Sequence, residues 1–450
     1  MKLFAIAAIA LSSLAQDAPL TMKDAVRQAS ERYPSIRVSR EQIAEAAASV
    51  RLAQTAFLPR VDAIAQVNRA TTNNVFGLFF PNPALPAISG PQIDGDQTRS
   101  VFGAALGLMV TWEPFDFGRR QADVDVSASA KALAEAAVAR TKLDVAAATA
   151  DAYLTALAAE QAVGAAKAGI TRNKEFEQII EALTKAELRP GADLARIQAD
   201  TIQVETQVVR AEQSVAQAKA LLEQYVGATV KALDAAPFLK AGGAVDAGAA
   251  GITAAHPQLV EQQRSIEEII ARMKAVDKGW YPKFAVQASA FGRGSGARVS
   301  GPFAGGAHGL YPDRGNWAVG FTATLPLLEF KQLRIRKEVE AQRQTREESK
   351  KELVERELSG RLAQAKVQLD GARRINTLAP RQLASLQSVL TQTQARYRAG
   401  LGTLLEVADA QRQLTQAEIE AALARLAVWR AELAMAYAQG DLEPFLARLP

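Results

Sequence analysis

The stretch TAFLPR at residues 55–60 decides the fold of this chain, and a second version of it, KGWYPK, follows at residues 278–283. Before each stretch the apolar residues recur at helical spacing, and after it they alternate with polar residues, as in a β-strand. Proline lacks an N–H group and cannot continue a helix interior, so Pro59 and Pro282 suit a switch from helix to strand. Because the switch occurs twice, the sequence predicts a duplicated architecture.

Each switch opens a pair of predicted strands, separated by a long loop rich in glycine or proline. We expect the strands at about residues 59–73, 99–113, 282–292 and 315–326. Prolines mark one end of every strand, and we expect the helix–strand junctions at Pro59, Pro114, Pro282 and Pro326. The junctions therefore share one end of the sheet, and the two long loops share the other.

These strands have the length and the single apolar face of transmembrane β-strands, which need about 9–11 residues. Trp112, Trp280 and Trp317 lie at strand ends, as in the aromatic girdles of membrane barrels. A bilayer accepts only a closed sheet, and four strands are too few, since barrels begin at about eight. Several chains must then share one barrel, and the pattern leaves two or three chains open. The alternative is a soluble α+β protein, but no separate apolar segments remain to cover its sheets.

Long helices account for most of the remaining chain. We expect them at residues 119–188, 192–226, 331–398 and 403–439, with Pro380 as a kink or break. The first of these would span on the order of 100 Å at about 1.5 Å per residue, which exceeds an ordinary globular core. Hydrophobic residues make up 48% of the chain but aromatic residues only 6%, a balance that suits long, closely packed helices.

The helices and strands divide the chain into two structural repeats, at residues 16–226 and 252–440. We expect a linker at residues 227–251 and a C-terminal tail at 441–450. Residues 1–15 have a lysine, a short apolar run and small residues before a cleavage point after Ala15, which is typical of a secretory signal peptide. The run is shorter than the about 20 residues of a membrane-spanning helix, so the sequence predicts export.

Residues for catalysis, cofactor binding or metal binding do not cluster in this sequence. It has no cysteine and only two histidines, His256 and His308, in different contexts. No nucleotide-binding motif occurs, so energy for any transport must come from a partner. The net charge of +5 is small for this length and indicates no nucleic-acid partner. The sequence therefore predicts neither an enzyme nor a cofactor.

Several short motifs recur in a fixed order in the two halves. They are Leu58-Pro59 and Tyr281-Pro282 at the strand starts, residues 115–119 and 328–330 at the strand exits, and the helix turns at 191–194 and 400–411. In this order the chain resembles the TolC family of outer-membrane efflux proteins from about Leu20 to Gln439. The resemblance implies a homotrimer whose 12-stranded β-barrel, set in outer-membrane lipid, continues as a long α-helical tunnel through the periplasm.

The resemblance also implies partners and sites. The partners are a periplasmic adaptor protein and an inner-membrane pump, and the channel is a passive, gated exporter. Tyr397 and Asp409 occupy positions associated with the periplasmic gate, although they could also be ordinary helix surface or tunnel lining. The turns that meet the adaptor contain Gly191, Asp193, Gly400, Gly402 and Thr403. Some family members have a basic residue where this chain has Gly402.

One alternative from another class stays open at this point. A secreted, oligomeric coiled-coil stalk would explain the long helices, but it would not explain two matched strand pairs. The cargo of an export channel is also open, because drugs, metal ions and polypeptides all fit the pattern.

Overall fold

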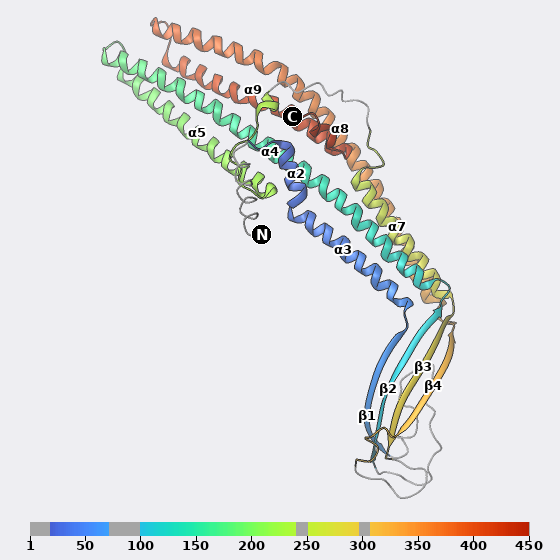
Figure 1. Cartoon of the computed structure of the whole chain (residues 1–450). Helices are drawn as coiled ribbons and strands as arrows, with labels where there is room; N and C mark the ends of the chain where they lie inside the picture. Colours follow the sequence, from blue (N-terminus) through green and yellow to red (C-terminus); the bar gives the residue numbers. More distant parts are fainter. Residues whose placement is uncertain (1–18, 72–99, 240–250, 297–306, 450) are drawn as a thin grey trace, which may run out of the picture. The chain divides into compact units, whose positions relative to one another are not determined.

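The computed structural model describes residues 19–71, 100–239, 251–296 and 307–449 (Figure 1). The predicted signal peptide, most of the two strand-connecting loops and part of the predicted linker lie outside these residues. The chain divides into two compact units: the first comprises Met1–Gln42, Ala134–Gln263 and Ser349–Pro450, and the second comprises Ile43–Leu133 and Arg264–Glu348.

The elements follow the helix–strand–strand–helix–helix order twice. They are α2 (Met22–Arg32), α3 (Pro34–Gln54), η2 (Thr55–Phe57), β1 (Arg60–Thr71), β2 (Ser100–Phe115), α4 (Arg119–Lys185), α5 (Gly191–Val226), α6 (Ala236–Leu239), α7 (Pro257–Asp277), η4 (Lys278–Trp280), β3 (Lys283–Ser295), β4 (Arg314–Thr324), α8 (Phe330–Arg398), α9 (Leu404–Gln439) and α10 (Glu443–Leu446).

The second unit contains one antiparallel sheet with the strand order β1-β2-β3-β4, visible in Figure 1. Its register places Val110 opposite both Val61 and Ala288, so these side chains share a face. The exposed large hydrophobic side chains of this face include Val61, Val67, Leu106, Leu108, Trp112, Val319 and Phe321. The opposite face carries polar and small residues such as Gln287 and Ser289. The sheet therefore has the apolar and polar faces predicted from the alternation.

The two repeated stretches adopt the same backbone path. In each, the helix tightens into a single 3-10 turn, which is followed by Leu58 in the first half and by Tyr281 in the second. Both residues are extended, with φ −81°, because the residue before a proline avoids the helical region. Strands β1 and β3 then begin directly after Pro59 and Pro282. The local sequence is thus sufficient to set these two junctions.

The junction after β2 differs from the prediction, because Pro114 lies inside the strand. The pairing of β2 with β3 is irregular between Trp112 and Phe115, and an irregularity of this kind accommodates a proline, which cannot donate to the ladder. The turn comes instead at Asp116, whose carboxylate accepts from the backbone N–H of Gly118 at 3.1 Å and of Arg120 at 2.8 Å. At the fourth junction, β4 ends two residues before Pro326.

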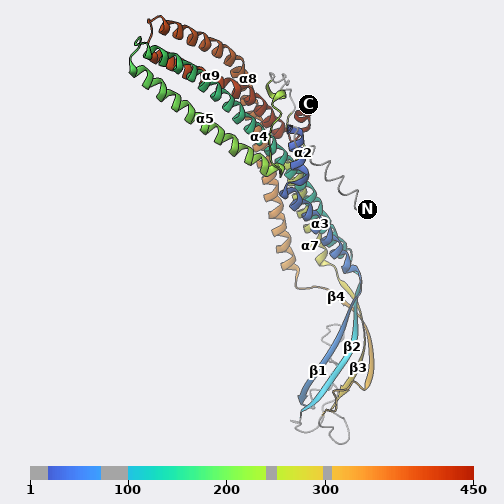
Figure 2. The same cartoon turned by 60° about the vertical axis from the view of Figure 1, so that its left-hand side comes forward.

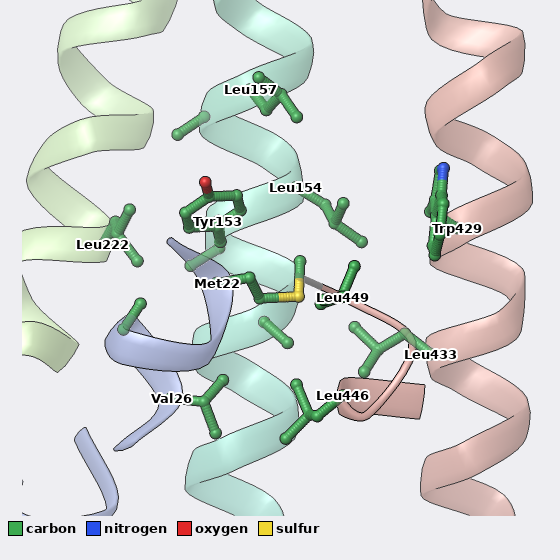
Figure 3. Packing of buried hydrophobic residues seen from close by; sticks show 14 of the residues in the cluster. Met22, Val26, Tyr153, Leu154, Leu157, Leu222, Trp429, Leu433, Leu446 and Leu449 are labelled. Atoms are coloured by element: carbon green, nitrogen blue, oxygen red, sulfur yellow. The ribbon is translucent and has the colours of Figure 1, made fainter. Parts of the chain in front are cut away.

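The first unit is built around a large apolar cluster from α2, α4, α5, α9 and α10 (Figure 3). Met22, Tyr153, Leu222 and Trp429 are buried there. The Tyr153 hydroxyl lies 2.8 Å from the carbonyl oxygen of Leu20 and 3.0 Å from that of Asp234, and donates its hydrogen between them. Burial raises the pKa of Tyr153 well above its ordinary value, so this donor stays protonated.

Two segments predicted as linker and tail take part in this core. Val230, Leu233 and Phe238 belong to the cluster, and residues 236–239 form α6, although residues 240–250 lie outside the described chain. Phe445 and Leu446 of α10 are also buried in it. The linker was predicted from its proline and glycine residues, and the tail from its terminal position. Neither feature indicates whether single apolar residues in the segment are buried.

The long helices differ from their predicted bounds by a few residues. Helix α4 ends at Lys185, before the expected 188, and α8 runs from Phe330 to Arg398 without a break at Pro380. A proline inside a helix removes one backbone hydrogen bond. Here the neighbouring Ala379 is buried and Leu383 packs on an apolar cluster, so packing maintains the helix. Among the described residues, no helix is long and apolar enough to cross a membrane.

Candidate gate at the helix turns

Two helix turns lie at the same end of the first unit, as both views show (Figures 1 and 2). One joins α4 to α5 and the other joins α8 to α9. The second turn closes through Gly400, whose φ of 77° suits glycine and whose N–H donates to the Tyr397 carbonyl at 3.1 Å. Thr403 then caps α9, its hydroxyl accepting from the Glu406 N–H at 3.3 Å. The local sequence therefore fixes the end of α8 and the start of α9.

Tyr397 connects the two turns. It is fully buried, and its ring packs edge-on against Phe176 of α4 with the centroids 5.6 Å apart. The Arg189 guanidinium lies 4.4 Å from the Tyr397 ring centroid and donates to the Tyr397 carbonyl oxygen at 2.7 Å. The Tyr397 hydroxyl donates to Asp193 Oδ2 at 3.2 Å. The end of α8 is thus held by α4, by the first turn and by the start of α5.

The Tyr397 hydroxyl keeps its proton at physiological pH. Burial raises the pKa of Tyr397, and the Asp193 charge and hydrogen bond raise it further, while Arg189 acts in the opposite direction. A neutral phenol beside a carboxylate donates a charge-assisted hydrogen bond, which is stronger than one between neutral groups. The contact between Tyr397 and Asp193 is of this stronger kind.

An apolar cluster, the gate cluster, supports this contact. Its buried members are Phe176, Ile180, Ile197, Leu390, Tyr397, Leu404, Val407, Ala410 and Leu414. They come from α4, α5, α8 and α9, so the ends of all four helices share one small core. Burial of apolar surface on this scale holds the turns together, and the Tyr397 hydroxyl adds a directional contact.

Asp409, the other predicted gate residue, takes no part in this cluster. It is half-exposed and forms an ion pair with Arg412, one turn along the same helix. Tyr397, by contrast, is buried within its own chain and bonded to Asp193. Asp193 had been assigned only to the adaptor-contacting turns. Arg189 and Phe176 were missed, because helical periodicity alone does not show which residues meet across two hairpins.

The other predicted turn residues lie as expected in the two turns but differ in their surroundings. Gly191 begins α5, and a Cβ added to it would meet nothing within 4 Å. A Cβ on Gly402 would lie 3.3 Å from Glu406 Oε2 and from the Tyr397 backbone nitrogen. Position 402 therefore lies against the residue that holds the two turns together.

A polar clasp joins α4 and α9 further along the helices. Arg172 donates to both carboxylate oxygens of Glu418, at 2.9 and 2.7 Å, and to the Thr415 hydroxyl at 3.0 Å. The helices approach closely here, since a Cβ on Gly169 would lie 2.8 Å from Thr415 Oγ1. Both charged side chains are mostly buried. This bidentate pair fixes the spacing of α4 and α9 next to the gate cluster.

Replacing Arg172 with methionine should destabilise the helical unit by about 1–3 kcal/mol, because Glu418 would stay mostly buried without its partner. Thermal melting followed by circular dichroism would show a lower Tm. Arg356→Met is the matched control, since its ion pair with Glu352 is largely exposed and contributes little. Equal Tm values for the two variants would contradict the clasp.

A cavity of about 680 Å³ lies between α5, α8 and α9 close to the clasp. Most of its lining side chains are polar, and amides predominate. The amides are those of Asn173, Gln203, Gln207, Gln382, Gln411, Gln413 and Gln416, and Asp200 adds a carboxylate. Gln411 is 3% exposed, and neither its amide nitrogen nor its amide oxygen has a hydrogen-bond partner. A buried amide without partners is costly, so this position offers unused hydrogen bonds.

Known proteins share both the sequence pattern and the fold. A family model described as outer membrane efflux protein matches residues 25–228 and 252–441. No curated protein matches the sequence closely enough to count as a relative.

Three solved structures illustrate the shared fold. The CmeC outer membrane channel of Campylobacter jejuni is 15% identical, with a TM-score of 0.73 over 93% of this chain and 85% of that one. A membrane protein from Pseudomonas aeruginosa is 20% identical, with a TM-score of 0.75 over 93% and 92% of the two chains. The outer membrane protein VceC of Vibrio cholerae is 16% identical, with a TM-score of 0.70 over 93% and 96%.

These matches confirm the fold class predicted from the sequence, that of the trimeric barrel continued by a periplasmic helical tunnel. They also confirm the outer-membrane location and the efflux channel function, and the family and fold are those of channels rather than enzymes. Channels of this family are trimeric and work with adaptor and pump partners. With a family model that covers nearly the whole described chain, this protein belongs to the outer membrane efflux protein family.

Proposed function

We propose that this outer-membrane efflux channel is a passive conduit whose periplasmic end is held shut by the contact between Tyr397 and Asp193. The buried Tyr397 hydroxyl, 3.2 Å from Asp193 Oδ2, is the observation that carries this proposal. It ties the end of α8 to the start of α5, so the α8–α9 hairpin can separate from the α4–α5 hairpin only when it breaks. Nothing in the fold or the family match favours the alternative of a secreted stalk.

The periplasmic adaptor would open this gate by binding at the turns. Gly191, Asp193, Gly400, Gly402 and Thr403 all lie in or beside them. A donor from the adaptor that engages the Asp193 carboxylate would compete with the Tyr397 hydroxyl for the same oxygen. Binding energy from the adaptor would then favour the open state, as a ligand shifts an equilibrium by its differential affinity for the two states.

The test is the conductance of purified trimers in planar lipid bilayers, measured alone and after addition of the adaptor. We expect low conductance from the channel alone and a rise on addition of the adaptor. High conductance from the channel alone would show that the turns do not close the pore, and the gate proposal would fail while the channel function would stand.

The amide-lined cavity suits a helix of the same adaptor. It is formed by α5, α8 and α9 and lies close to the gate cluster, and its lining offers both donors and acceptors. Gln411 has both amide atoms unpaired in the channel, so a partner that supplies hydrogen bonds there would remove an existing penalty. We therefore place part of the adaptor contact in this cavity.

Replacing Gln411 with leucine should affect stability and binding in opposite directions. Leucine removes a buried amide without partners, so the Tm of the free channel should stay equal or rise. Adaptor affinity, measured by surface plasmon resonance, should fall about tenfold if about 1.4 kcal/mol of binding energy is lost. Gln392→Leu is the control, because Gln392 is exposed on α8 and bonds to Ser388. Unchanged affinity in Gln411→Leu would remove the cavity from the adaptor contact.

A further inference from the structure

A small apolar pocket of about 290 Å³ lies in the second unit, where the first 3-10 turn meets the sheet. Its walls are Phe57, Pro59, Val110, Trp112, Val286 and Ala288. Every one of these side chains is apolar apart from the indole nitrogen of Trp112. The pocket therefore suits a hydrocarbon ligand, with no lining group that would bind an ion or a sugar.

The two aromatic walls are fixed by the junction itself. The Trp112 indole N–H donates to the Phe57 carbonyl oxygen at 3.2 Å, which uses the one polar atom of the lining. The Arg120 guanidinium lies 4.7 Å from the centroid of the Phe57 ring and donates to the Ala56 carbonyl at 3.1 Å. Arg120 is itself buried against Asp116 at 2.8 Å. The pocket is thus preformed and does not need a ligand to shape it.

The register of the sheet places the pocket on the face that meets the bilayer. Trp112 pairs with Val286, and Val110 pairs with Ala288, whereas Thr111 and Gln287 point to the other side. The same face carries Leu108, which is 54% exposed. In a barrel set in the outer membrane this apolar face contacts lipid tails. The pocket is therefore continuous with the membrane interface and open to lipid.

Basic residues surround this end of the sheet. Arg60 follows Pro59 and its side chain is 77% exposed, but it is paired with Asp62 at 2.9 Å and adds little net charge. The Lys278 ammonium group lies 5.2 Å from the Tyr281 ring centroid. Helix α8 begins with Lys331, Arg334 and Arg336, all exposed, against one acidic residue, Glu329, directly before it. Exposed basic residues beside interfacial aromatic residues attract anionic lipid headgroups.

We infer that the pocket binds one acyl chain of an anionic phospholipid from the periplasmic leaflet, whose headgroup meets the basic residues at the helix–strand junctions. The acyl chain passes between Phe57 and Trp112 and lies against Ala288. One such site occurs on each protomer, away from the pore. It attaches the channel to a lipid at the level where strands become helices.

The test is to fill the pocket. Ala288→Leu adds three carbons to its floor, and Ala290→Leu is the matched control, because Ala290 lies one pair further along the same face, opposite Leu108. Native mass spectrometry of trimers reconstituted in equal phosphatidylglycerol and phosphatidylethanolamine should show about one fewer retained phosphatidylglycerol per protomer in Ala288→Leu only. Equal lipid retention in Ala288→Leu and the wild type would overturn the site.

A second measurement uses the unaltered barrel, in case Ala288→Leu fails to assemble. Trimers in bilayers with a few per cent of phosphatidylglycerol brominated in mid-chain should lose more Trp112 fluorescence than the lipid's mole fraction predicts, with Trp112→Phe supplying the background. Quenching in proportion to mole fraction would mean ordinary surrounding lipid and no site. Equal excess quenching by brominated phosphatidylethanolamine would overturn the anionic headgroup.

Discussion

Replacing Leu108 with lysine is expected to abolish assembly of the trimer in the outer membrane. Leu108 lies in the middle of β2, opposite Ala63 and Ala290, on the face with exposed apolar side chains. Lysine on the lipid face of a barrel costs about 2–4 kcal/mol at the bilayer midplane. A trimer would carry this penalty three times. Outer-membrane fractionation with heat-modifiable trimers on SDS gels is the measurement.

Met109→Lys is the control for this prediction, because the next residue along the strand faces the opposite side of the sheet, where the barrel has water. It should assemble close to the wild-type level. Val61→Lys should have an intermediate effect. Val61 is the second residue of β1 and so lies near the membrane interface, where the penalty for lysine falls to about 0–1 kcal/mol. Normal trimer yield in Leu108→Lys would show that the lipid-facing side was assigned wrongly.

Replacing Asp193 with alanine should raise the conductance of the isolated channel. The substitution leaves the buried Tyr397 hydroxyl without an acceptor in the closed state, at a cost of about 1–3 kcal/mol, whereas water would satisfy it once the turns separate. Each 1.4 kcal/mol changes an equilibrium about tenfold, so a roughly tenfold shift towards the open state is expected for each protomer. Planar-bilayer recordings would show longer or larger open events.

Two further variants separate this gate from the one predicted by sequence alone. Tyr397→Phe should raise conductance less than Asp193→Ala, because the Asp193 carboxylate that it leaves unpaired is partly exposed to water. Asp409→Ala should have little effect, because Asp409 pairs with Arg412 on its own helix. If Asp409→Ala opens the channel and Asp193→Ala does not, the contact between Tyr397 and Asp193 is not the gate.

The sequence was informative where the structure depends on neighbouring residues. The proline switches at Pro59 and Pro282 start both strands, because a proline restricts the residue before it and ends a helix whatever surrounds it. Side chains alternate between the two faces of a strand, so the alternation of apolar and polar residues along β1 and β3 was enough to predict the two faces of the sheet. Both features are repeated within the chain, so each half was evidence for the other.

The sequence was less informative where distant segments meet. Tyr397 and Asp193 are 204 residues apart, and helical periodicity does not state which of several polar residues in two turns will pair. Pro114 was predicted to mark a strand end because a proline cannot donate to the ladder. The irregularity that accommodates it inside β2 depends on the pairing of β2 with β3, which the local sequence does not show. Helical periodicity does not distinguish Gln411 from the other polar residues of its helix, and only the packing of α9 shows that it is buried.

The packing of α10 has a consequence for how the channel matures. The Lys23 ammonium group donates to the Leu449 carbonyl oxygen at 2.9 Å, across 426 residues of sequence, and Phe445 is buried in the same core as Met22. Contacts between such distant segments form slowly, because a long loop must close before they stabilise anything. The Trp429 ring packs against Phe445 of α10 with the centroids 6.2 Å apart, so this part of the core stays uncovered during export until α10 arrives. Because transiently exposed apolar surface promotes aggregation, we expect the exported chain to be most prone to aggregate in that interval.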